Sequence, residues 1–585
     1  MDRKTLIGLG LIMAIVVIYM QFFLFPETEP IDPEVAETSE LADPRPEALS
    51  DSFADFASPI NVADEQATFA FTEPIAKQTD LFDIVFDPQG GSITSLRLRE
   101  HADVEGRHVD LVVRPGQDRF FDVVFGDYRT EPVTALFDFE QLDAYTFQFS
   151  RVLLDQNGAP FTLTKRYHFA PGSYLFQVSV EIDHSLNEFP ALDFDGIGYT
   201  LAVAPQIGPE YGSLGGGLFA ASSAELREFW NFTNGKAGSQ RFPRGQQVVT
   251  ERKHVTWSAI VGKHFAVIAE PAVAFDQVTY DARPDPEIDR RGALYFSRPP
   301  LTSSRNEDTF RVYAGPRNPT EMVRYNESDP FGGGGHEFER AVSRRPLIGW
   351  LSNLLRGLLD LLYRLIPNYG VAIILMTILI KAILFPLTKK SMESTAKMGA
   401  LSPKINALRE KHKGNPQKMN QEVAQLYKKE GVNPAGGCLP ILLQMPIFFA
   451  LFDLLSTNFD LRGAVFIAPW IADLSSPETL FSIGGLDVRI LPFVMSGSQL
   501  FQTRLTQSNT GSQRQMKFMM YGLPIVFFFI LYGMPSGLVV YWTMQNFLSI
   551  GQQLYFNEKR KRDAAGGSDS AGKGGGGKKP PPRSK

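Results

Sequence analysis

An apolar stretch at residues 371–385 constrains this chain most, because its sequence VAIILMTILIKAILF predicts a helix that crosses a lipid bilayer. Lys381 is the one charged residue within it. A cation at bilayer depth costs about 2.5 to 3.5 kcal/mol, so it persists mainly where it meets water, a counter-charge or a substrate. The pair Lys389 and Lys390 marks the expected helix end, which places Lys381 about 12 Å deeper at ~1.5 Å per residue. The alternative is a lysine whose stem snorkels to the nearer surface.

Loop charges predict a polytopic α-helical membrane protein with six transmembrane helices. The loops at 389–434 and 557–585 each carry a net charge of +6, so both are expected in the cytoplasm. Residues 457–489 lean acidic and fit outside, whereas 504–517 are basic and fit inside. Six spans satisfy every loop, and both termini are then cytoplasmic. The spans are expected at residues 6–25, 370–388, 437–455, 490–503, 518–532 and 537–556.

The N-terminal span at residues 1–25 is predicted to be an uncleaved signal anchor. Arg3 and Lys4 precede its apolar core, which continues to Phe25. The alternative is a cleaved signal peptide, but this run is longer than a usual signal core and lacks an Ala-x-Ala site. Residues 26–79 are rich in Pro, Glu, Asp and Ala, which predicts a disordered acidic linker.

A long soluble domain is inserted after this linker, at residues 80–330. Apolar residues there alternate with polar ones, as at 145–149 and 176–182, and Asn157-Gly158 suits a hairpin turn. This pattern predicts an antiparallel all-β sandwich whose strands end near residue 315. The glycines at 332–335 are expected to form its flexible end. The predicted topology places this domain in the periplasm of a bacterium.

Three further segments have a predicted structure. Residues 346–366 have leucines on one helical side and charges on the other, which favours an interfacial amphipathic helix. The cytoplasmic segment 389–434 is expected to form a helical hairpin, with helices at 391–412 and 417–430. Its lysine-rich faces could contact anionic lipid, ribosomal RNA or an acidic protein, or could simply be solvated. Residues 557–585 are expected to form a basic disordered tail.

No catalytic, cofactor or metal site is predicted. The histidines have no HExxH spacing, and the chain has no GxSxG or Walker motif. Its single cysteine, Cys438, excludes an intramolecular disulfide. A secondary transporter and a membrane-anchored glycan-modifying enzyme are the alternative functions. The first should show internal repeats, and the second needs paired catalytic carboxylates in the β domain.

Four motifs carry a resemblance to a known family: FPLT at 385–388, NPAGGCLP at 433–440, QMPIF at 444–448 and PSGLVVYW at 535–542. In this order around a basic hairpin, they resemble the YidC membrane protein insertase family, with a strong match over residues 346–556. The anchor, linker and β domain resemble its Gram-negative form, which has a periplasmic β-supersandwich similar to sugar-binding folds. The resemblance implies a multi-pass inner-membrane protein that is not an enzyme.

The resemblance also implies a hydrophilic groove within a five-helix core at residues 370–556. Lys381 matches the charged groove residue, commonly an arginine, that receives polar segments of nascent membrane proteins. Gln502 and Trp542 match groove positions, and Thr377 and Tyr541 are further candidates. The implied partners are nascent membrane proteins, the phospholipid bilayer, the Sec translocon and the ribosome, with no specific nucleic acid sequence. Lysine keeps the charge of arginine without its planar bidentate fork.

Overall fold

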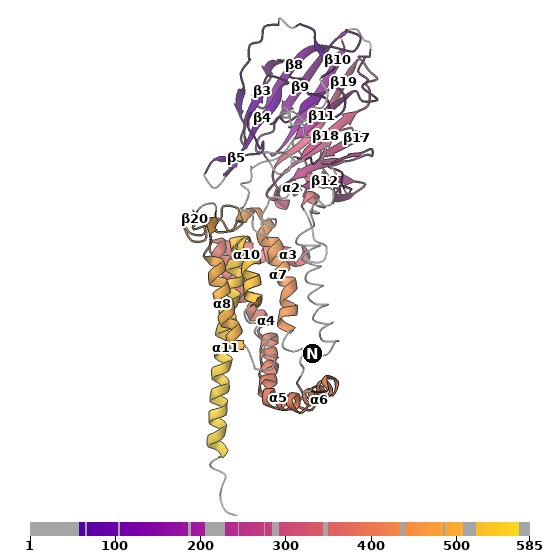
Figure 1. The fold of residues 1–585 in the computed structure, drawn as a ribbon. Helices are drawn as coiled ribbons and strands as arrows, with labels where there is room; N and C mark the ends of the chain where they lie inside the picture. The colour runs from indigo at the N-terminus through magenta and orange to yellow at the C-terminus, as the bar shows by residue number, and fades with distance from the viewer. Residues whose placement is uncertain are drawn as a thin grey trace, which may run out of the picture. The chain divides into compact units, whose positions relative to one another are not determined.

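The computed structural model divides the chain into two compact units, a β unit and a helical unit (Figure 1). The predicted anchor and the linker up to residue 57 lie outside the described residues, as do residues 572–585 of the tail. The described residues are 58–64, 67–102, 106–184, 189–204, 228–243, 245–273, 275, 277–283, 292–342, 349–412, 414–432, 439–483, 486–506 and 522–571.

The strands of the β unit form three antiparallel sheets. They are β1 (Asn61–Val62), β2 (Ile75–Gln78), β3 (Phe82–Asp87), β4 (Ser92–Ala102), β5 (His108–Asp110), β6 (Asp122–Val124), β7 (Asp138–Gln141), β8 (Thr146–Leu154), β9 (Pro160–His168), β10 (Leu175–His184), β11 (Tyr199–Ala204), β12 (Glu228–Thr233), β13 (Lys236–Ser239), β14 (Val248–Glu251), β15 (Trp257–Val261), β16 (Phe265–Pro271), β17 (Gln277–Asp281), β18 (Ala293–Arg298) and β19 (Arg305–Pro316). The ten-stranded sheet has the order β1-β8-β9-β10-β19-β16-β15-β12-β13, with β7 paired to β8. The others have the orders β14-β17-β18-β11-β6 and β2-β3-β4-β5.

Apolar alternation produces these strands, as predicted. Phe176, Val178, Val180 and Ile182 of β10 are all buried, while the residues between them are partly or fully exposed. β8 and β9 form a hairpin through the predicted turn, where Gly158 has a φ of +77°. All described strand pairs are antiparallel, so the prediction of an antiparallel all-β domain is confirmed for these residues.

Aromatic side chains fill the space between the sheets. Phe86 of the four-stranded sheet lies 5.3 Å from Phe149 of the ten-stranded sheet, measured between ring centroids. Phe296 of the five-stranded sheet lies 5.5 Å from Phe310 of the ten-stranded sheet. The smaller sheets therefore both pack on the largest one. Aromatic burial of this size supplies the core that a domain without disulfides needs.

The β unit is longer at both ends than predicted. β1 and β2 lie within the predicted linker, and Ile75 is buried and pairs with Phe86. After β19 follow α2 (Pro319–Glu327) and η4 (Phe338–Ala341), whose buried Met322 and Phe338 belong to the same core. The predicted end at residue 330 is therefore wrong, because burial and pairing extend the unit to residue 342. The glycine run at 332–335, predicted as a flexible end, is held by a hydrogen bond, since the N–H of Gly333 donates to the carboxylate of Asp329 at 2.7 Å.

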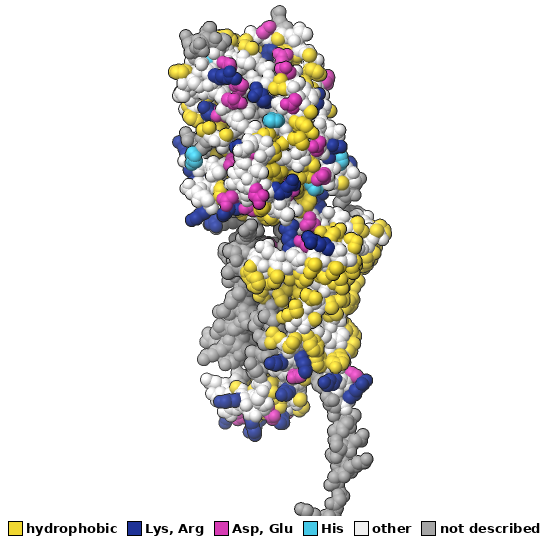
Figure 2. Space-filling model, turned by 180° about the vertical axis from the view of Figure 1, so that it is seen from behind, with side chains coloured by type: hydrophobic (Ala, Val, Ile, Leu, Met, Phe, Trp, Pro, Cys, Tyr) yellow, Lys and Arg dark blue, Asp and Glu magenta, His cyan; other side chains and the backbone are white. Residues whose placement is uncertain are grey.

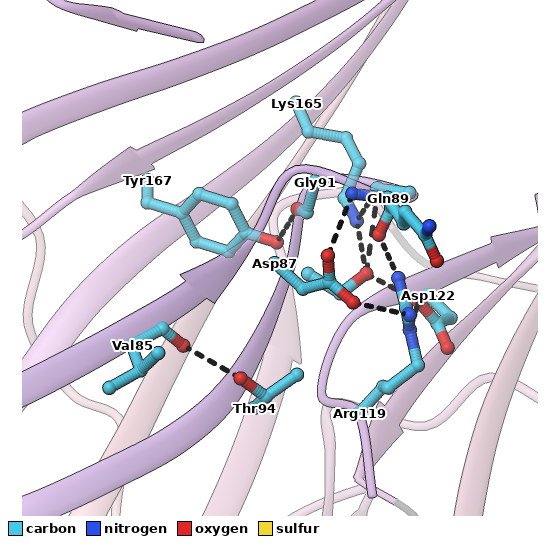
Figure 3. Close-up of polar contacts among 11 residues, drawn as sticks. Val85, Asp87, Gln89, Gly91, Thr94, Arg119, Asp122, Lys165 and Tyr167 are labelled. Carbon is cyan, nitrogen blue, oxygen red and sulfur yellow. Dashed lines mark hydrogen bonds and ion pairs between the residues drawn. The ribbon is translucent and has the colours of Figure 1, made fainter. Parts of the chain in front are cut away.

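Four charged side chains meet inside the β unit, where all three sheets approach one another (Figure 3). Lys165 of β9 is fully buried and its Nζ donates to the carbonyl of Gly90 at 2.8 Å. Arg119 contacts Asp87 at 2.7 Å and Asp122 at 3.2 Å. Burial, aided by the nearby guanidinium, lowers the pKa of Lys165 to about 7, although the two carboxylates oppose this shift. Two acids and two bases balance one another here, which allows Lys165 and Asp122 to be buried.

The helical unit contains the predicted core helices at their expected places. They are α3 (Gly349–Leu365), α4 (Tyr369–Ala400), α5 (Ser402–Lys411), α6 (Pro416–Lys429), α7 (Leu439–Thr457), α8 (Leu491–Thr506), α10 (Leu523–Tyr532) and α11 (Ser536–Ala571). Within the described residues, α4 alone has the length and the apolar composition to cross a membrane. The helix α7 contains the shorter apolar stretch Gln444–Leu455. The count of six spans stays a prediction.

Two helices run further than predicted. α4 does not end at Lys389 and Lys390 but continues to Ala400, so the predicted helix at 391–412 is divided at Leu401. The reason is that residues 387–398 contain no Gly or Pro to stop the helix. α11 continues to Ala571, so the beginning of the predicted disordered tail is helical. An ion pair between Glu558 and Arg562, four residues apart at 3.2 Å, supports this extension.

The helices bury one apolar face against each other and expose another. The fully buried residues at the contact include Ile373 and Met376 of α4, Leu455 of α7 and Leu538 of α11. Figure 2 shows a broad hydrophobic belt on the outside of the helical unit, with Lys and Arg gathered beyond it where α5 and α6 lie. The exposed residues include Ile383, Phe493, Phe501, Ile525, Phe529 and Phe547. An exposed apolar surface of this extent is typical of contact with lipid.

The two predicted surface elements are formed as helices. α3 buries Leu355 and Leu359 against the unit, while Trp350 and Leu365 are 67% and 70% exposed. α5 and α6 form an antiparallel hairpin, in which the ammonium of Lys404 pairs with Glu430 at 2.8 Å. His412 and Glu422 form the second pair, at 3.1 Å, near the turn. The structure thus has two paired helices in this segment, and the first of them starts at Ser402.

Candidate functional site

Lys381 lies in the interior of α4, with 9% of its surface exposed. The side chain of Asn368 caps this helix by accepting the N–H of Val371 at 3.0 Å. The Nζ of Lys381 donates to the Oγ of Ser549 on α11 at 2.7 Å. Among the described residues, no carboxylate forms an ion pair with it. The ammonium is thus held by a neutral hydroxyl and is not neutralised by a neighbouring acid.

A row of polar side chains lies along α11 on both sides of Ser549 in the sequence. The row consists of Gln545, Asn546, Ser549, Gln552 and Gln553. Asn546 donates to the hydroxyl of Ser498 on α8 at 2.9 Å, which joins the row to a second helix. In the part of the chain that the structure describes, the side-chain oxygens of Gln545 and Gln552 are buried and have no hydrogen-bond partner. Such oxygens are costly in a dry interior, so they mark a place for water or a polar ligand.

Trp542 connects three other helices at this site. Its indole N–H donates to the side-chain oxygen of Gln499 on α8 at 2.8 Å. Its ring lies 5.0 Å from that of Phe448 on α7 and 5.0 Å from that of Phe527 on α10, between centroids. Gln502 is half-buried on α8, about one turn after Gln499. Trp542 is therefore bonded to Gln499, a residue that the resemblance did not single out.

The two remaining candidates lie in the packed interior. Thr377 is fully buried, and its hydroxyl donates to the carbonyl of Ile373 in its own helix at 2.7 Å. Tyr541 is 1% exposed, and its hydroxyl is near Gln444 without hydrogen-bond geometry. α11 contacts both α4 and α8, which brings these residues into one helix cluster with Lys381. Their roles in a groove stay predictions.

Sequence reasoning missed Ser549, Gln545, Asn546 and Gln499. A signal for the first three was available, since polar residues recur at helical spacing over residues 545–553 within an apolar span. No comparable signal separates Gln499 from Gln502. Among the described residues, no group of three or more His, Cys, Asp or Glu is placed to hold a metal ion.

Comparisons with known proteins agree with both units. The family described as "60Kd inner membrane protein" matches residues 361–563, and "YidC periplasmic domain" matches residues 75–342. A membrane protein insertase YidC from Treponema denticola is 35% identical over 508 residues, which is 83% of this chain and 86% of that protein. Its counterpart from Treponema pallidum is 34% identical over 530 residues, which is 82% of this chain and 83% of that protein.

A solved structure of an active YidC insertase, with its first transmembrane domain resolved, is also similar. It shares 19% identity with a TM-score of 0.33, and the match covers 85% of this chain and 95% of that one. The curated relatives are named as insertases, in agreement with the prediction that the chain is not an enzyme. The two family matches together span most of the sequence, from β2 of the β unit to α11. The chain belongs to the YidC family of membrane protein insertases.

Proposed function

We infer that this chain, as a member of the YidC family, is a membrane protein insertase, and we propose that Lys381 receives the polar segments of its substrates. One observation carries this proposal. The ammonium of Lys381 is almost buried in an apolar helix, and its hydrogen bond goes to a neutral hydroxyl at 2.7 Å. A buried cation that no acid neutralises attracts a carboxylate strongly. The incoming acidic segment supplies that carboxylate.

The mechanism requires positioning and solvation rather than covalent chemistry. A hydrophilic segment that enters beside the polar row of α11 keeps hydrogen-bonding partners that a bare bilayer would not provide. Its apolar helix then moves into lipid along exposed side chains, such as Ile525 and Phe529 of α10. A membrane potential that is negative inside favours outward movement of an acidic segment by about 2.3 kcal/mol per charge per 100 mV. Nucleotide hydrolysis is not required for these steps.

The same proposal includes a topology and partners. Six spans would place both termini and the basic hairpin of α5 and α6 in the cytoplasm, and the β unit in the periplasm. The protein would then be a multi-pass protein of the bacterial inner membrane. Gln502, Trp542, Thr377 and Tyr541 would form the groove with Lys381. Nascent membrane proteins and lipid are the primary partners, and the Sec translocon and the ribosome are proposed as further ones.

Replacement of Lys381 tests this function. In cells depleted of their own insertase, Lys381→Glu is expected to lower insertion of short acidic-tailed membrane proteins about tenfold, equivalent to ~1.4 kcal/mol, because it repels the tail. Lys381→Arg is the matched control and should retain most of the insertion, since it keeps the charge. Protease protection of the translocated tail measures the insertion. Normal insertion by the Glu variant would show that Lys381 does not receive the substrate.

A further inference from the structure

Ser549 is the hydrogen-bond partner of Lys381, although the two residues lie 168 positions apart in the sequence. The hydroxyl of Ser549 has one proton, and it donates that proton to the carbonyl of Gln545 at 2.8 Å. The oxygen lone pairs of the hydroxyl are therefore left to face the ammonium, at 2.7 Å. The orientation of this acceptor is fixed by the backbone of α11.

A lysine side chain would otherwise have several ways to avoid this position. Its stem is flexible, and it can snorkel towards a membrane surface. A carboxylate on α11 would also hold the ammonium, but it would cancel the charge and occupy the place of the substrate's acid. A serine hydroxyl holds the ammonium without cancelling its charge. Because an ammonium has three N–H donors, two remain for a ligand after the bond to Ser549.

Gln545 provides a second, independent observation at the same place. It lies one helical turn before Ser549 and is 7% exposed. Within the described residues, its side-chain oxygen is buried without a hydrogen-bond partner. An unpartnered acceptor oxygen one turn from the residue that holds the ammonium suits a peptide segment, whose carboxylate meets the ammonium while a backbone N–H meets the amide oxygen.

We propose that Ser549 is a positioning residue, which anchors the ammonium of Lys381 to α11 without neutralising it and so creates the preference for carboxylate-bearing segments. This inference rests on the proposed function of Lys381. It assigns the selectivity for charge to a contact between two helices rather than to the lysine alone.

The test compares two tails on one substrate. The purified full-length protein is reconstituted in liposomes with a single-span substrate whose short tail carries either Asp or Asn at the same positions. The readout is the ratio of protected Asp tail to protected Asn tail. Ser549→Ala is expected to lower this ratio about threefold to tenfold, which is within the range for loss of a typical hydrogen bond. Ser549→Thr should restore the ratio, because it restores the hydroxyl.

A matched control separates positioning from a general effect on α11. The hydroxyl of Thr543 also donates to the carbonyl four residues earlier, that of Val539, at 2.7 Å, and among the described residues it forms no hydrogen bond with a charged group. Thr543→Val should therefore keep the wild-type ratio. The proposal is overturned if Ser549→Ala leaves the ratio unchanged, including the case in which both tails lose insertion equally.

Lys381→Gln distinguishes failure of this inference from failure of the proposed function. If Lys381→Gln reduces the ratio to about one and Ser549→Ala does not change it, Lys381 selects acidic tails without help from Ser549. If Lys381→Gln itself leaves the ratio at the wild-type value, the proposed role of Lys381 is wrong, and the inference about Ser549 fails with it.

Discussion

Two lysines in this chain, Lys165 and Lys381, are buried, but they differ in the groups that surround their ammonium. Lys165 is enclosed by a guanidinium and the carboxylates of Asp87 and Asp122, so its surroundings balance its charge. Lys381 is 9% exposed, and its hydrogen bond goes to a hydroxyl. Both lysines bear the cost of burial, but the first is compensated within the fold. The second meets no such compensation among the described residues, and under the proposed function an incoming acidic segment would supply it.

Gly91, beside the charged cluster, is expected to tolerate no side chain. Its φ is +59°, and an added Cβ would lie 2.7 Å from the Cβ of Phe149. Gly91→Ala should therefore lower the free energy of unfolding of the β unit by about 2 to 4 kcal/mol, through strain and overpacking. Urea denaturation followed by circular dichroism measures the change. Gly158→Ala is the control, because Gly158 has a φ of +77° and open space around it, and should cost about 1 kcal/mol.

At the scale of elements, a histidine fastens the segment between α2 and η4 to the ten-stranded sheet. The Nδ1 of His336 contacts Glu270 of β16, and its Nε2 lies 2.9 Å from Asp329. Arg311 of β19 also pairs with Asp329, at 2.7 Å, and the ring of Phe338 stacks on the imidazole. A neutral imidazole can donate to only one of two carboxylates, so this arrangement favours the doubly protonated ring.

The pKa of His336 has a direction that predicts a pH dependence. Burial alone lowers this pKa, but the hydrogen bonds and charges of Glu270 and Asp329 raise it above 6.5 overall. The stabilisation is therefore complete below about pH 6.5 and is lost as the pH rises through the raised value. Amide exchange of residues 328–341, corrected for its intrinsic pH dependence, should become faster across that range in the full-length protein.

His336→Gln is the variant that checks this assignment. It should exchange at least about tenfold faster in that segment at pH 5.5, as expected for loss of ~1.5 to 3 kcal/mol of charged hydrogen bonding. It should also lose the pH dependence above pH 6. If the variant keeps the wild-type pH profile, another group must control the attachment of this segment.

At the scale of the whole molecule, the chain consists of two units with separate cores. The β unit buries Phe, Tyr and Trp between its own sheets, and its charged cluster consists of ion pairs among its own residues. We therefore expect residues 58–342, produced alone, to fold as a soluble domain with one cooperative thermal transition. Circular dichroism and calorimetry measure this transition. A fragment that ends at residue 330 should melt at a lower temperature or fail to fold, because it lacks His336 and Phe338.

Much of the fold was predictable because its signals are local. Alternation over residues 176–182 predicts β10, and the apolar run at 371–385 predicts the centre of α4, since both patterns reflect contact with solvent or lipid. Element ends were less predictable. The β unit continues to residue 342 because of burial that the glycine run does not reveal. The helix α4 continues to Ala400 because the two lysines that suggested its end do not stop a helix.

By itself, the sequence determined that an unusual charge lies in a membrane helix and that a large β domain precedes it. Only the tertiary structure decided what that charge meets. Ser549, which accepts from Lys381, lies 168 residues away from it, and Gln499 of another helix accepts from Trp542. The composition of a segment and the spacing of its apolar residues predict an apolar helix. They do not predict which of its polar side chains faces a given neighbouring helix. That choice depends on the rotation and axial position of each helix, which the packing of all the helices sets together.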